Sequence, residues 1–187
     1  STRPVSGATG TVEVADPAGK GVGRHPRLRR AVPAGLHDIT QLGDRARQGC
    51  RIRVLLADPN GAAVRRRGEE EGFGIGLAHR VLLSLRYYEP ILAIPGVQVR
   101  LHDTTLYASI FRVDETMLVN THVYGSTAAH NPVLHLRRVP GGRVVDHYLA
   151  SFDRVWTQAK PTSDIKRGDS HVRREMTDTT PRLLQRP

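Results

Sequence analysis

The amino-acid sequence predicts one α/β domain in which a mixed β-sheet is flanked by helices. Three observations predict this class. A chain of 187 residues fits one domain of ordinary size with some residues left over. The first part of the chain alternates helical and strand patterns. A run of short strands then precedes a last helix, and this order favours a sheet with both parallel and antiparallel neighbours.

The first half of the core is expected to run helix, strand, helix. Apolar residues recur at helical spacing over 36–46 and again over 77–88. Between these helices, the apolar run 51–57 (RIRVLLA) is rich in strand formers and ends at a turn sequence, 58–61 (DPNG). We interpret the charged stretch 65–71 (RRRGEEE), which precedes the second helix, as a solvated segment.

The second half is expected to add a series of strands and a final helix. Residues 97–102 alternate between apolar and polar side chains, which is typical of a half-buried strand. The expected elements are strands at 97–102, 106–112, 117–124 and 133–139, a hairpin turn at 113–116 and a helix at 144–156. The hairpin carries most of the candidate site residues.

Both ends of the chain are expected to be flexible. Residues 1–33 are broken by glycine and proline and end in a basic cluster, although the alternation at Thr11–Val14 fits a short strand. The other end is polar and has no sustained period. The predicted organisation is a flexible basic N-terminal segment (1–33), the α/β domain (34–160) and a flexible C-terminal tail (161–187).

The formal net charge of the chain is +10, and arginine supplies almost all of it. Arginine bias together with abundant Ala, Gly and Val is typical of a GC-rich bacterial genome, so part of this charge reflects codon usage. A positive field still attracts phosphates, nucleic acid or anionic lipid. The charge therefore indicates an anionic partner without identifying it.

Other features exclude several classes of protein. The single cysteine, Cys50, excludes an internal disulfide and the zinc sites that are built from paired cysteines. No run approaches the roughly 18 apolar residues of a membrane span, and the start shows no apolar leader. We therefore expect a cytoplasmic protein without a metal, a cofactor or a membrane span.

Polar side chains gather on one face of the predicted hairpin. Its turn places Ser109 opposite Asn120 and Tyr107 opposite His122, and because side chains alternate along a strand these four share a face with Tyr124. A solvated strand face usually carries Lys, Glu and Thr, whereas these residues are short-reach hydrogen-bonding groups. We interpret the face as a binding site, and the alternative is a water-facing side of an ordinary hairpin.

Arginine would supply the positive charge of such a site. A guanidinium group binds phosphate through two parallel hydrogen bonds, so an arginine near the hairpin suits an anion pocket. Arg112 ends the first hairpin strand and is the preferred phosphate ligand, with Arg51, Arg53 and Arg100 on neighbouring strands as weaker candidates.

Residues 107–122 also carry a motif spacing, which reads Tyr107-x-Ser109-x-x-x-x-Asp114 and then Asn120-Thr121-His122. It resembles the phospholipase D-like superfamily, whose members carry His-x-Lys-x-x-x-x-Asp and then Gly-Ser-x-Asn. The chain is also similar to an actinobacterial group of phospholipase D-like domains that is often attached to helix-turn-helix regulators. This similarity lies in residues 52–59, 96–114, 120–125, 132–142 and 148–156.

The resemblance implies a phospholipase D-like fold with a degenerate active site. Enzymes of that superfamily use the motif histidine as the nucleophile and the lysine to stabilise the transferring phosphoryl group. Tyr107 and Ser109 stand at those two positions, and tyrosine, with an unperturbed pKa of about 10, forms little phenolate at neutral pH. The family builds its site from two motif copies, so one copy implies a homodimer or an incomplete site.

The expected function is therefore binding of a phosphate ester, such as a nucleotide or a lipid head group, in a regulatory sensor. The ligand-binding residues predicted for it are Tyr107, Ser109, Arg112, Asp114, Asn120, His122 and Tyr124. One alternative is a phosphodiesterase or phosphotransferase with His122 as the nucleophile. A second alternative is nucleic-acid binding through the basic termini, with affinity that falls steeply with salt. Whether the protein is an enzyme stays open at this stage.

Overall fold

The computed structural model describes residues 10–15 and 38–162. Within this part of the chain one sheet has the strand order β6-β5-β4-β1-β2-β3-β7. Its strands are β1 (Gly10–Ala15), β2 (Arg51–Ala57), β3 (Val97–His102), β4 (Ala108–Val113), β5 (Thr116–Thr121), β6 (Val133–Arg137) and β7 (Lys160–Pro161). The α-helices are α1 (Ile39–Arg47), α2 (Ala62–Glu70), α3 (Gly76–Tyr88) and α4 (Val144–Gln158), and short 3-10 helices lie at Glu89–Ile91 and Ala128–His130.

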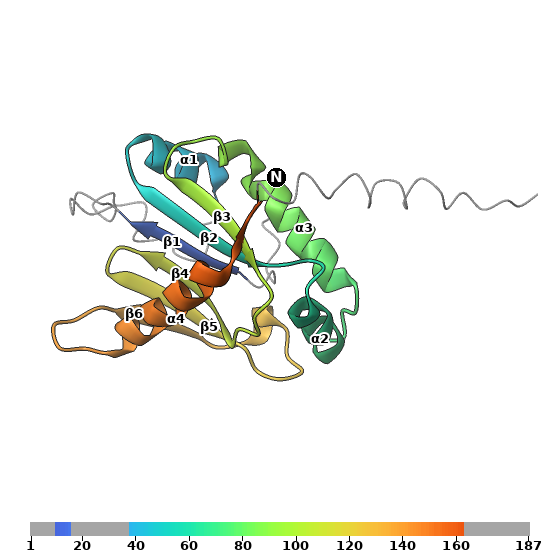
Figure 1. Ribbon diagram of the computed structural model, residues 1–187. Coiled ribbons are helices and arrows are strands. Elements are labelled where there is room, and N and C mark those ends of the chain that lie inside the picture. Colours follow the sequence, from blue (N-terminus) through green and yellow to red (C-terminus); the bar gives the residue numbers. More distant parts are fainter. Residues whose placement is uncertain (1–9, 16–37, 163–187) are drawn as a thin grey trace, which may run out of the picture.

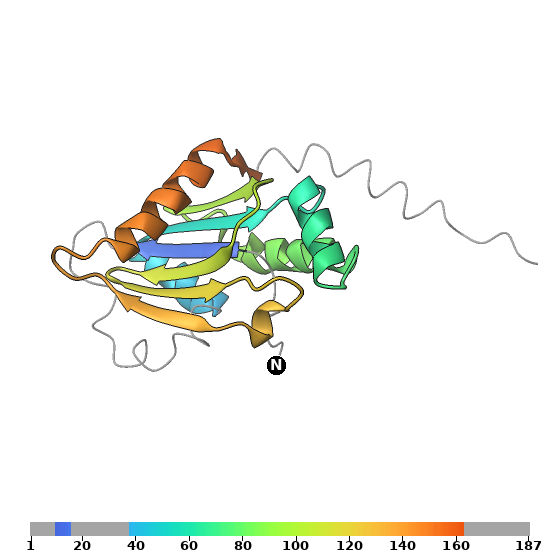
Figure 2. The same ribbon diagram turned by 90° about the horizontal axis from the view of Figure 1, so that it is seen from below.

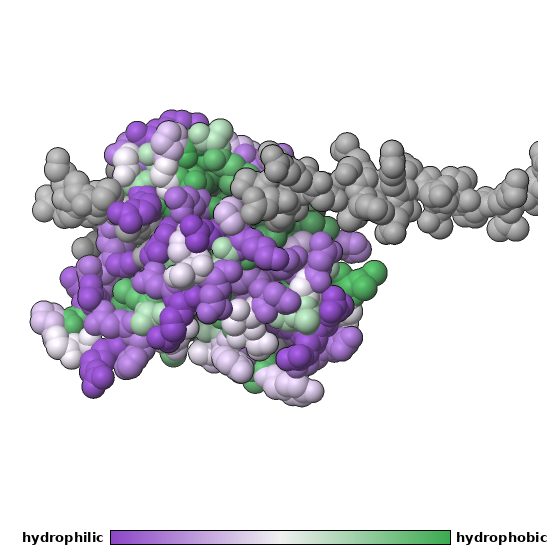
Figure 3. Space-filling view, in the orientation of Figure 1, coloured by the Kyte–Doolittle hydropathy of each residue, from purple (hydrophilic) through white to green (hydrophobic). Residues whose placement is uncertain are grey.

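The helices lie on both faces of the sheet (Figures 1 and 2). Helices α1 and α3 pack on one face, α4 crosses the other, and α2 lies beyond the ends of the strands. The face that carries α4 is mostly hydrophilic on its outside (Figure 3), as expected where one side of a helix meets water. The α/β class and the mixed sheet flanked by helices are therefore as predicted from the sequence.

Strand directions bring several strand ends to one edge of the sheet. Strands β2 and β3 are parallel, β1 is antiparallel to β2, and β4 is parallel to β1. Strand β4 therefore begins where β2 and β3 end, and its antiparallel neighbour β5 ends there too. Helix α2 follows β2 directly at this edge, which becomes the place where side chains from four elements meet.

Burial on both faces explains why β2 reads as a continuous apolar run. One face of β2 and β3 packs against α1 and α3, and the residues of this core include Leu42, Ile52, Val54, Leu77, Val81 and Val99. The other face packs against α4, with Leu55, Phe152, Val155 and Trp156 in one cluster and Ile110, Met117, Val119 and Val145 in another.

Several predicted elements have the predicted bounds or register. Strands β2 and β3 span the predicted residues, 51–57 and 97–102. In the β4–β5 hairpin Ser109 pairs with Asn120 and Arg112 with Met117, which is the predicted register. The strands themselves are shorter than predicted, because β4 begins only at Ala108 and β5 ends at Thr121.

The N-terminal prediction is confirmed in one respect and wrong in another: the alternation at Thr11–Val14 lies in a strand, but that strand is not part of a flexible segment. Residues Gly10–Ala15, expected within a flexible segment, form β1 between β2 and β4 in the middle of the sheet, and Val12 is buried. At the other end, Pro161 of the expected tail belongs to β7. The rest of the two segments expected to be flexible, residues 1–9, 16–33 and 163–187, lies outside the described residues.

The sequence predicts no membrane span. Within residues 38–162, where the described helices lie, none is long and apolar enough to cross a bilayer.

Candidate ligand-binding site

A pocket of about 330 Å³ opens at the edge where β2, β3 and β5 end. It is lined by one face of α2, the loop that follows β3 and the loop that follows β5, together with the last residues of β2 and β3. The lining side chains with polar or aromatic groups are Arg66, Arg67, Glu70, Glu71, His102, Thr104, Thr105, Tyr107, His122 and Tyr124. Ligand pockets at the carboxyl ends of parallel strands are common in α/β proteins.

The position of α2 is fixed at its start by the loop after β3. Asp103 Oδ1 accepts a hydrogen bond of 2.8 Å from the backbone N–H of Ala63, and this bond lowers the pKa of the Asp103 carboxyl. Gly61 precedes the helix, and a Cβ on it would lie 2.4 Å from Asp103 Oδ1. The carboxylate thus occupies the helix N-terminus and ties the lining segment of the loop to α2.

A second contact fixes α2 against the loop that leads to α3. A Cβ on Gly68 would lie 2.2 Å from the carbonyl oxygen of Gly74. The Gly68 carbonyl accepts hydrogen bonds of 2.8 Å from the N–H groups of Phe73 and Gly74. Because only glycine permits this approach, the sequence at Gly68 helps to set the direction in which α2 presents its side chains.

An ion pair on α2 faces the pocket. Arg67 and Glu71 are four residues apart, and Arg67 Nε contacts Glu71 Oε1. The exposed fractions of the two side chains are only 13% and 6%. This corrects the interpretation of residues 65–71 as a solvated segment for Arg67 and Glu71 alone, because the other charged side chains of the segment are exposed as expected. Burial of a charge pair carries a desolvation cost. The contact with Glu71 offsets part of this cost and holds the guanidinium group at a defined place.

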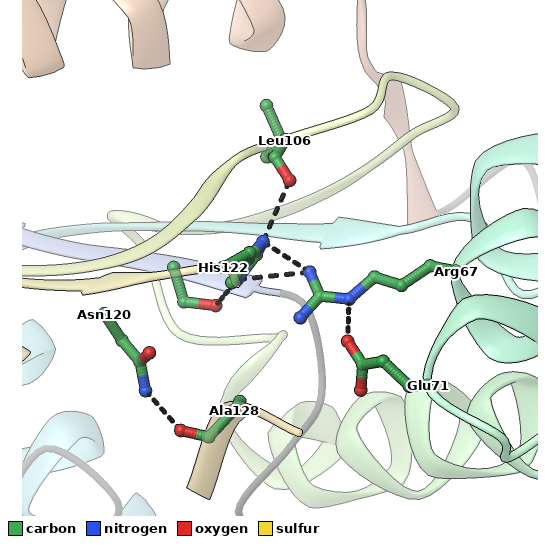
Figure 4. A network of polar contacts seen from close by, with 7 residues as sticks. Arg67, Glu71, Leu106, Asn120, His122 and Ala128 are labelled. Carbon is green, nitrogen blue, oxygen red and sulfur yellow. Dashed lines mark hydrogen bonds and ion pairs between the residues drawn. The ribbon is translucent and has the colours of Figure 1, made fainter. Parts of the chain in front are cut away.

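His122, directly after β5, lies at the centre of the polar network (Figure 4). His122 Nδ1 is 2.9 Å from the carbonyl oxygen of Leu106, and Nε2 is 3.1 Å from Ser109 Oγ. Arg67 Nη1 lies 2.6 Å from Nδ1 and 3.1 Å from Nε2. The Leu106 carbonyl can only accept and the Arg67 guanidinium can only donate, so these two groups cannot both be hydrogen-bonded to Nδ1 of a neutral ring. With the hydrogen on Nδ1 donated to Leu106, Nε2 is the acceptor for Ser109 Oγ and Arg67 Nη1.

The surroundings keep this imidazole neutral. Burial, and secondly the positive charge of Arg67, lower the pKa of His122 from 6.5 to about 4. The hydrogen bond with the Leu106 carbonyl opposes this effect only in part. At physiological pH the site therefore holds one guanidinium charge beside an uncharged ring.

Two side chains that line the pocket each have a nitrogen atom without a hydrogen-bond partner in the part of the chain that the structure describes. Arg67 Nη2 and His102 Nε2 are buried and have no hydrogen-bond partner among the described residues. His102 Nδ1 accepts from the N–H of Thr104 at 3.2 Å, so its Nε2 carries a hydrogen. Burial lowers the pKa of His102 and keeps this ring neutral. A buried donor without a partner costs about 1–3 kcal/mol of stability.

The structure brings only part of the predicted site together. Tyr107, His122 and Tyr124 line the pocket, and Ser109, which is buried, contacts His122 from the neighbouring strand. Asn120 does not line the pocket; its Nδ2 donates to the carbonyl oxygen of Ala128 at 2.9 Å.

Arg112 and Asp114 lie at the other end of the hairpin. Arg112 Nε donates to the backbone carbonyl oxygen of Asp114 at 2.7 Å, and Asp114 adopts a left-handed φ of 50° in the turn. Neither residue lines the pocket. The alternation along β4 also directs Arg112 to the face opposite Ser109, so the hairpin register that groups the other residues separates Arg112 from them.

The sequence-based site lacks several residues that the fold brings to the pocket, among them Arg66, Arg67, Glu71 and His102. A signal for one pair was present, because Arg67 and Glu71 have the spacing of neighbours on a helix. Nothing in the stretch RRRGEEE shows which face of α2 is turned inward. Among residues 10–15 and 38–162, no group of three or more His, Cys, Asp or Glu is placed to hold a metal ion.

Comparison with protein families matches residues 36–163 to the family described as Domain of unknown function (DUF5919). The match covers the described helices and every strand except β1. No curated protein and no solved structure matches the chain.

Proposed function

We propose that this chain, which belongs to the family described as Domain of unknown function (DUF5919), binds a small phosphate-bearing ligand in the pocket. One observation carries the proposal. Arg67 is fixed at the pocket wall through Nε by Glu71 and through Nη1 beside His122, while the buried Nη2 has no partner among the described residues. Phosphate oxygens are strong acceptors that match the fork of a guanidinium group.

The balance of charges indicates how the ligand would be held. The lining contains two arginines, Arg66 and Arg67, and two glutamates, Glu70 and Glu71, while both lining histidines have lowered pKa values. The formal charge of these groups is therefore close to zero. Recognition would rest on directed hydrogen bonds from Arg67 and His102 more than on a general positive field, and its salt dependence would be weak.

The resemblance to phospholipase D-like domains supports the same class of ligand. Tyr107 and Ser109 stand in the place of the usual His-Lys pair, and Arg67 would supply the positive charge from a different element. Binding without turnover suits a cytoplasmic regulatory sensor. The single motif copy further supports a homodimer, which sedimentation analysis would test.

The test compares two neighbouring arginines on α2. Arg66 lines the pocket, whereas Arg65, which is exposed as well, does not line it and donates to the Asn60 carbonyl. We expect inorganic phosphate, glycerol 3-phosphate and a nucleoside monophosphate to raise the melting temperature, with at least one binding measurably by calorimetry. Arg66→Gln should weaken binding about fivefold and Arg67→Lys, which keeps the charge but loses the fork, about tenfold.

Arg65→Gln is the matched control, because it removes the same charge from the same helix. Its affinity should stay within about twofold of the wild type. Equal losses in Arg65→Gln and Arg66→Gln would show that only the general charge of α2 attracts the ligand. Failure of all three compounds to bind would contradict the proposal.

Catalysis by His122 is the second candidate. The Leu106 carbonyl fixes the hydrogen on Nδ1, so the lone pair of the neutral ring is on Nε2. Nε2 would attack phosphorus while the ester P–O bond breaks and its electron pair leaves with the ester oxygen. Water would then hydrolyse the phosphohistidine. Ser109 Oγ and Arg67 Nη1 both lie 3.1 Å from the same nitrogen, so attack requires both contacts to open.

A chromogenic phosphodiester separates the two candidates. Turnover that is lost in His122→Ala but kept in Tyr124→Phe would establish that His122 is the nucleophile. Binding of phosphate compounds without turnover would leave a binding domain.

A further inference from the structure

Two tyrosines stand at the mouth of the pocket with their side chains in water. The exposed fractions of Tyr107 and Tyr124 are 80% and 84%, and both residues line the pocket. Val123, between His122 and Tyr124, is 51% exposed and lines it too. Large aromatic rings are usually buried more deeply, and a local group of exposed apolar side chains beside a pocket often marks a contact surface.

The backbone keeps these rings next to the polar network. The N–H of His122 donates to the carbonyl oxygen of Tyr107 at 2.8 Å, so Tyr107 is paired with the central residue of the network. Tyr124 follows two residues later, in a turn closed by a 3.1 Å hydrogen bond from Ser126 N–H to the Val123 carbonyl. Gly125 in that turn has a φ of +70°. The aromatic rim of the pocket, formed by Tyr107 and Tyr124, and the guanidinium group of Arg67 therefore belong to one site.

We propose that the ligand is a nucleoside phosphate whose base stacks on Tyr107 and Tyr124 while its phosphate reaches Arg67. This inference rests on the proposed function, because it names the class of phosphate ester that the same pocket takes. Bases stack on tyrosine rings with little dependence on sequence, and each such contact contributes substantially to affinity. A phosphate group alone would make no use of the rim.

A lipid head group fits this site less well. Binding at a lipid surface uses a wide apolar face together with a cluster of basic residues. Here the exposed apolar groups of the rim are Tyr107, Val123 and Tyr124, and the lining charges on α2 are balanced between arginine and glutamate. Three exposed apolar side chains lack the breadth of a membrane-binding surface.

A nucleoside phosphate unit occurs both in free nucleotides and in single-stranded nucleic acid. Both share the chemistry that the site would recognise, so both are included as probes. Thymidine 5′-monophosphate represents the free nucleotide and a thymidine hexanucleotide represents the strand. Tighter binding of the hexamer per site would identify the strand as the source, and equal or tighter binding of the monomer would identify the free nucleotide.

The decisive comparison is between a phosphate with a base and one without. Adenosine 5′-monophosphate and ribose 5-phosphate are titrated into the full chain by calorimetry. We expect the nucleotide to bind about tenfold more tightly. In Tyr107→Leu/Tyr124→Leu its affinity should fall to that of ribose 5-phosphate, whose own affinity should not change. Tyr107→Phe/Tyr124→Phe keeps both rings and should retain the preference.

The outcomes distinguish this inference from the proposal on which it rests. Equal affinity of the two compounds for the wild type would overturn the stacking inference and leave phosphate binding intact. Loss of ribose 5-phosphate binding in the Leu double variant would also overturn it, because the rings would then support the pocket itself. If neither compound binds, both proposals fail. Melting curves check folding, which these exposed positions should not disturb.

Discussion

The two ends of the β4–β5 hairpin each have an arginine close by, but in different surroundings. At the turn, Arg112 donates to the backbone of Asp114 and lies outside the pocket. At the open end, Arg67 reaches His122 from α2, and Tyr107 lines the same pocket. An arginine next in sequence to a motif is therefore less informative than one that a separate helix brings to it. The fold places the charge where strand ends and a helix converge.

The largest expected effect concerns the buried pair that holds Arg67 in place. Arg67→Ala leaves the Glu71 carboxylate buried without its partner, and the free energy of unfolding should fall by about 3–5 kcal/mol. Arg67→Met/Glu71→Met removes both charges and should recover most of that loss while abolishing phosphate binding. Urea unfolding measures the first effect and calorimetry the second.

An exposed pair on α1 serves as the control for this prediction. Arg47 and Asp44 are 3.0 Å apart, with exposed fractions of 61% and 59%. Asp44→Ala should cost about 0.5 kcal/mol or less. A similar cost for Arg67→Ala would mean that the pair on α2 is solvated after all.

A smaller effect is expected from the contact that directs α2. In Gly68→Ala the new Cβ would collide with the Gly74 carbonyl, so the free energy of unfolding should fall by about 1–3 kcal/mol and ligand affinity should fall with it. Gly76→Ala is the matched change, since the nearest atom to its Cβ would be 4.0 Å away. Equal effects of the two changes on unfolding would exclude a steric role for Gly68.

The third prediction concerns pH. The folded-state pKa of His122 is lowered to about 4, so between about pH 4 and 6.5 the unfolded chain binds a proton that the folded chain does not. His122 therefore makes stability rise with pH across this window, and the contribution is lost as pH falls. The difference in unfolding free energy between pH 7 and pH 5 should be smaller in His122→Gln. An unchanged difference would place the ring in water.

The smallest effect is expected at the turn end of the hairpin. Arg112→Gln removes the bond to the Asp114 carbonyl and should cost about 0.5–1.5 kcal/mol of stability. Phosphate affinity should stay within about twofold of the wild type. A loss of affinity larger than that of Arg66→Gln would restore Arg112 as the phosphate ligand.

Local patterns were sufficient to predict part of this fold. The run RIRVLLA and the alternation VQVRLH each define a strand, and the turn predicted at 113–116 defined the hairpin register. The sequence around β1 gave a weaker signal, because a short strand between glycine-rich stretches becomes recognisable only beside β2 and β4. Its place in the sheet is a tertiary property.

The candidate site was less predictable for a similar reason. His122, Tyr107 and Tyr124 could be grouped from strand alternation alone. Arg67 could not be added to this group from the sequence, because the direction of its side chain depends on tertiary contacts of α2. These are the hydrogen bond from Ala63 to Asp103 and the close approach of Gly68 to Gly74. A helical stretch with charges of both signs looks solvated until such contacts show which side is covered.

The most direct test of the account is to follow the arginine side chains while inorganic phosphate is titrated into the protein. Nitrogen-15 spectra resolve the guanidinium groups, and assignments come from Arg67→Lys and Arg112→Gln. The account predicts a saturable shift of the Arg67 signal, together with the His122 ring, and no shift of Arg112. A saturable shift of Arg112 with Arg67 unmoved would contradict it and place the ligand at the other end of the hairpin.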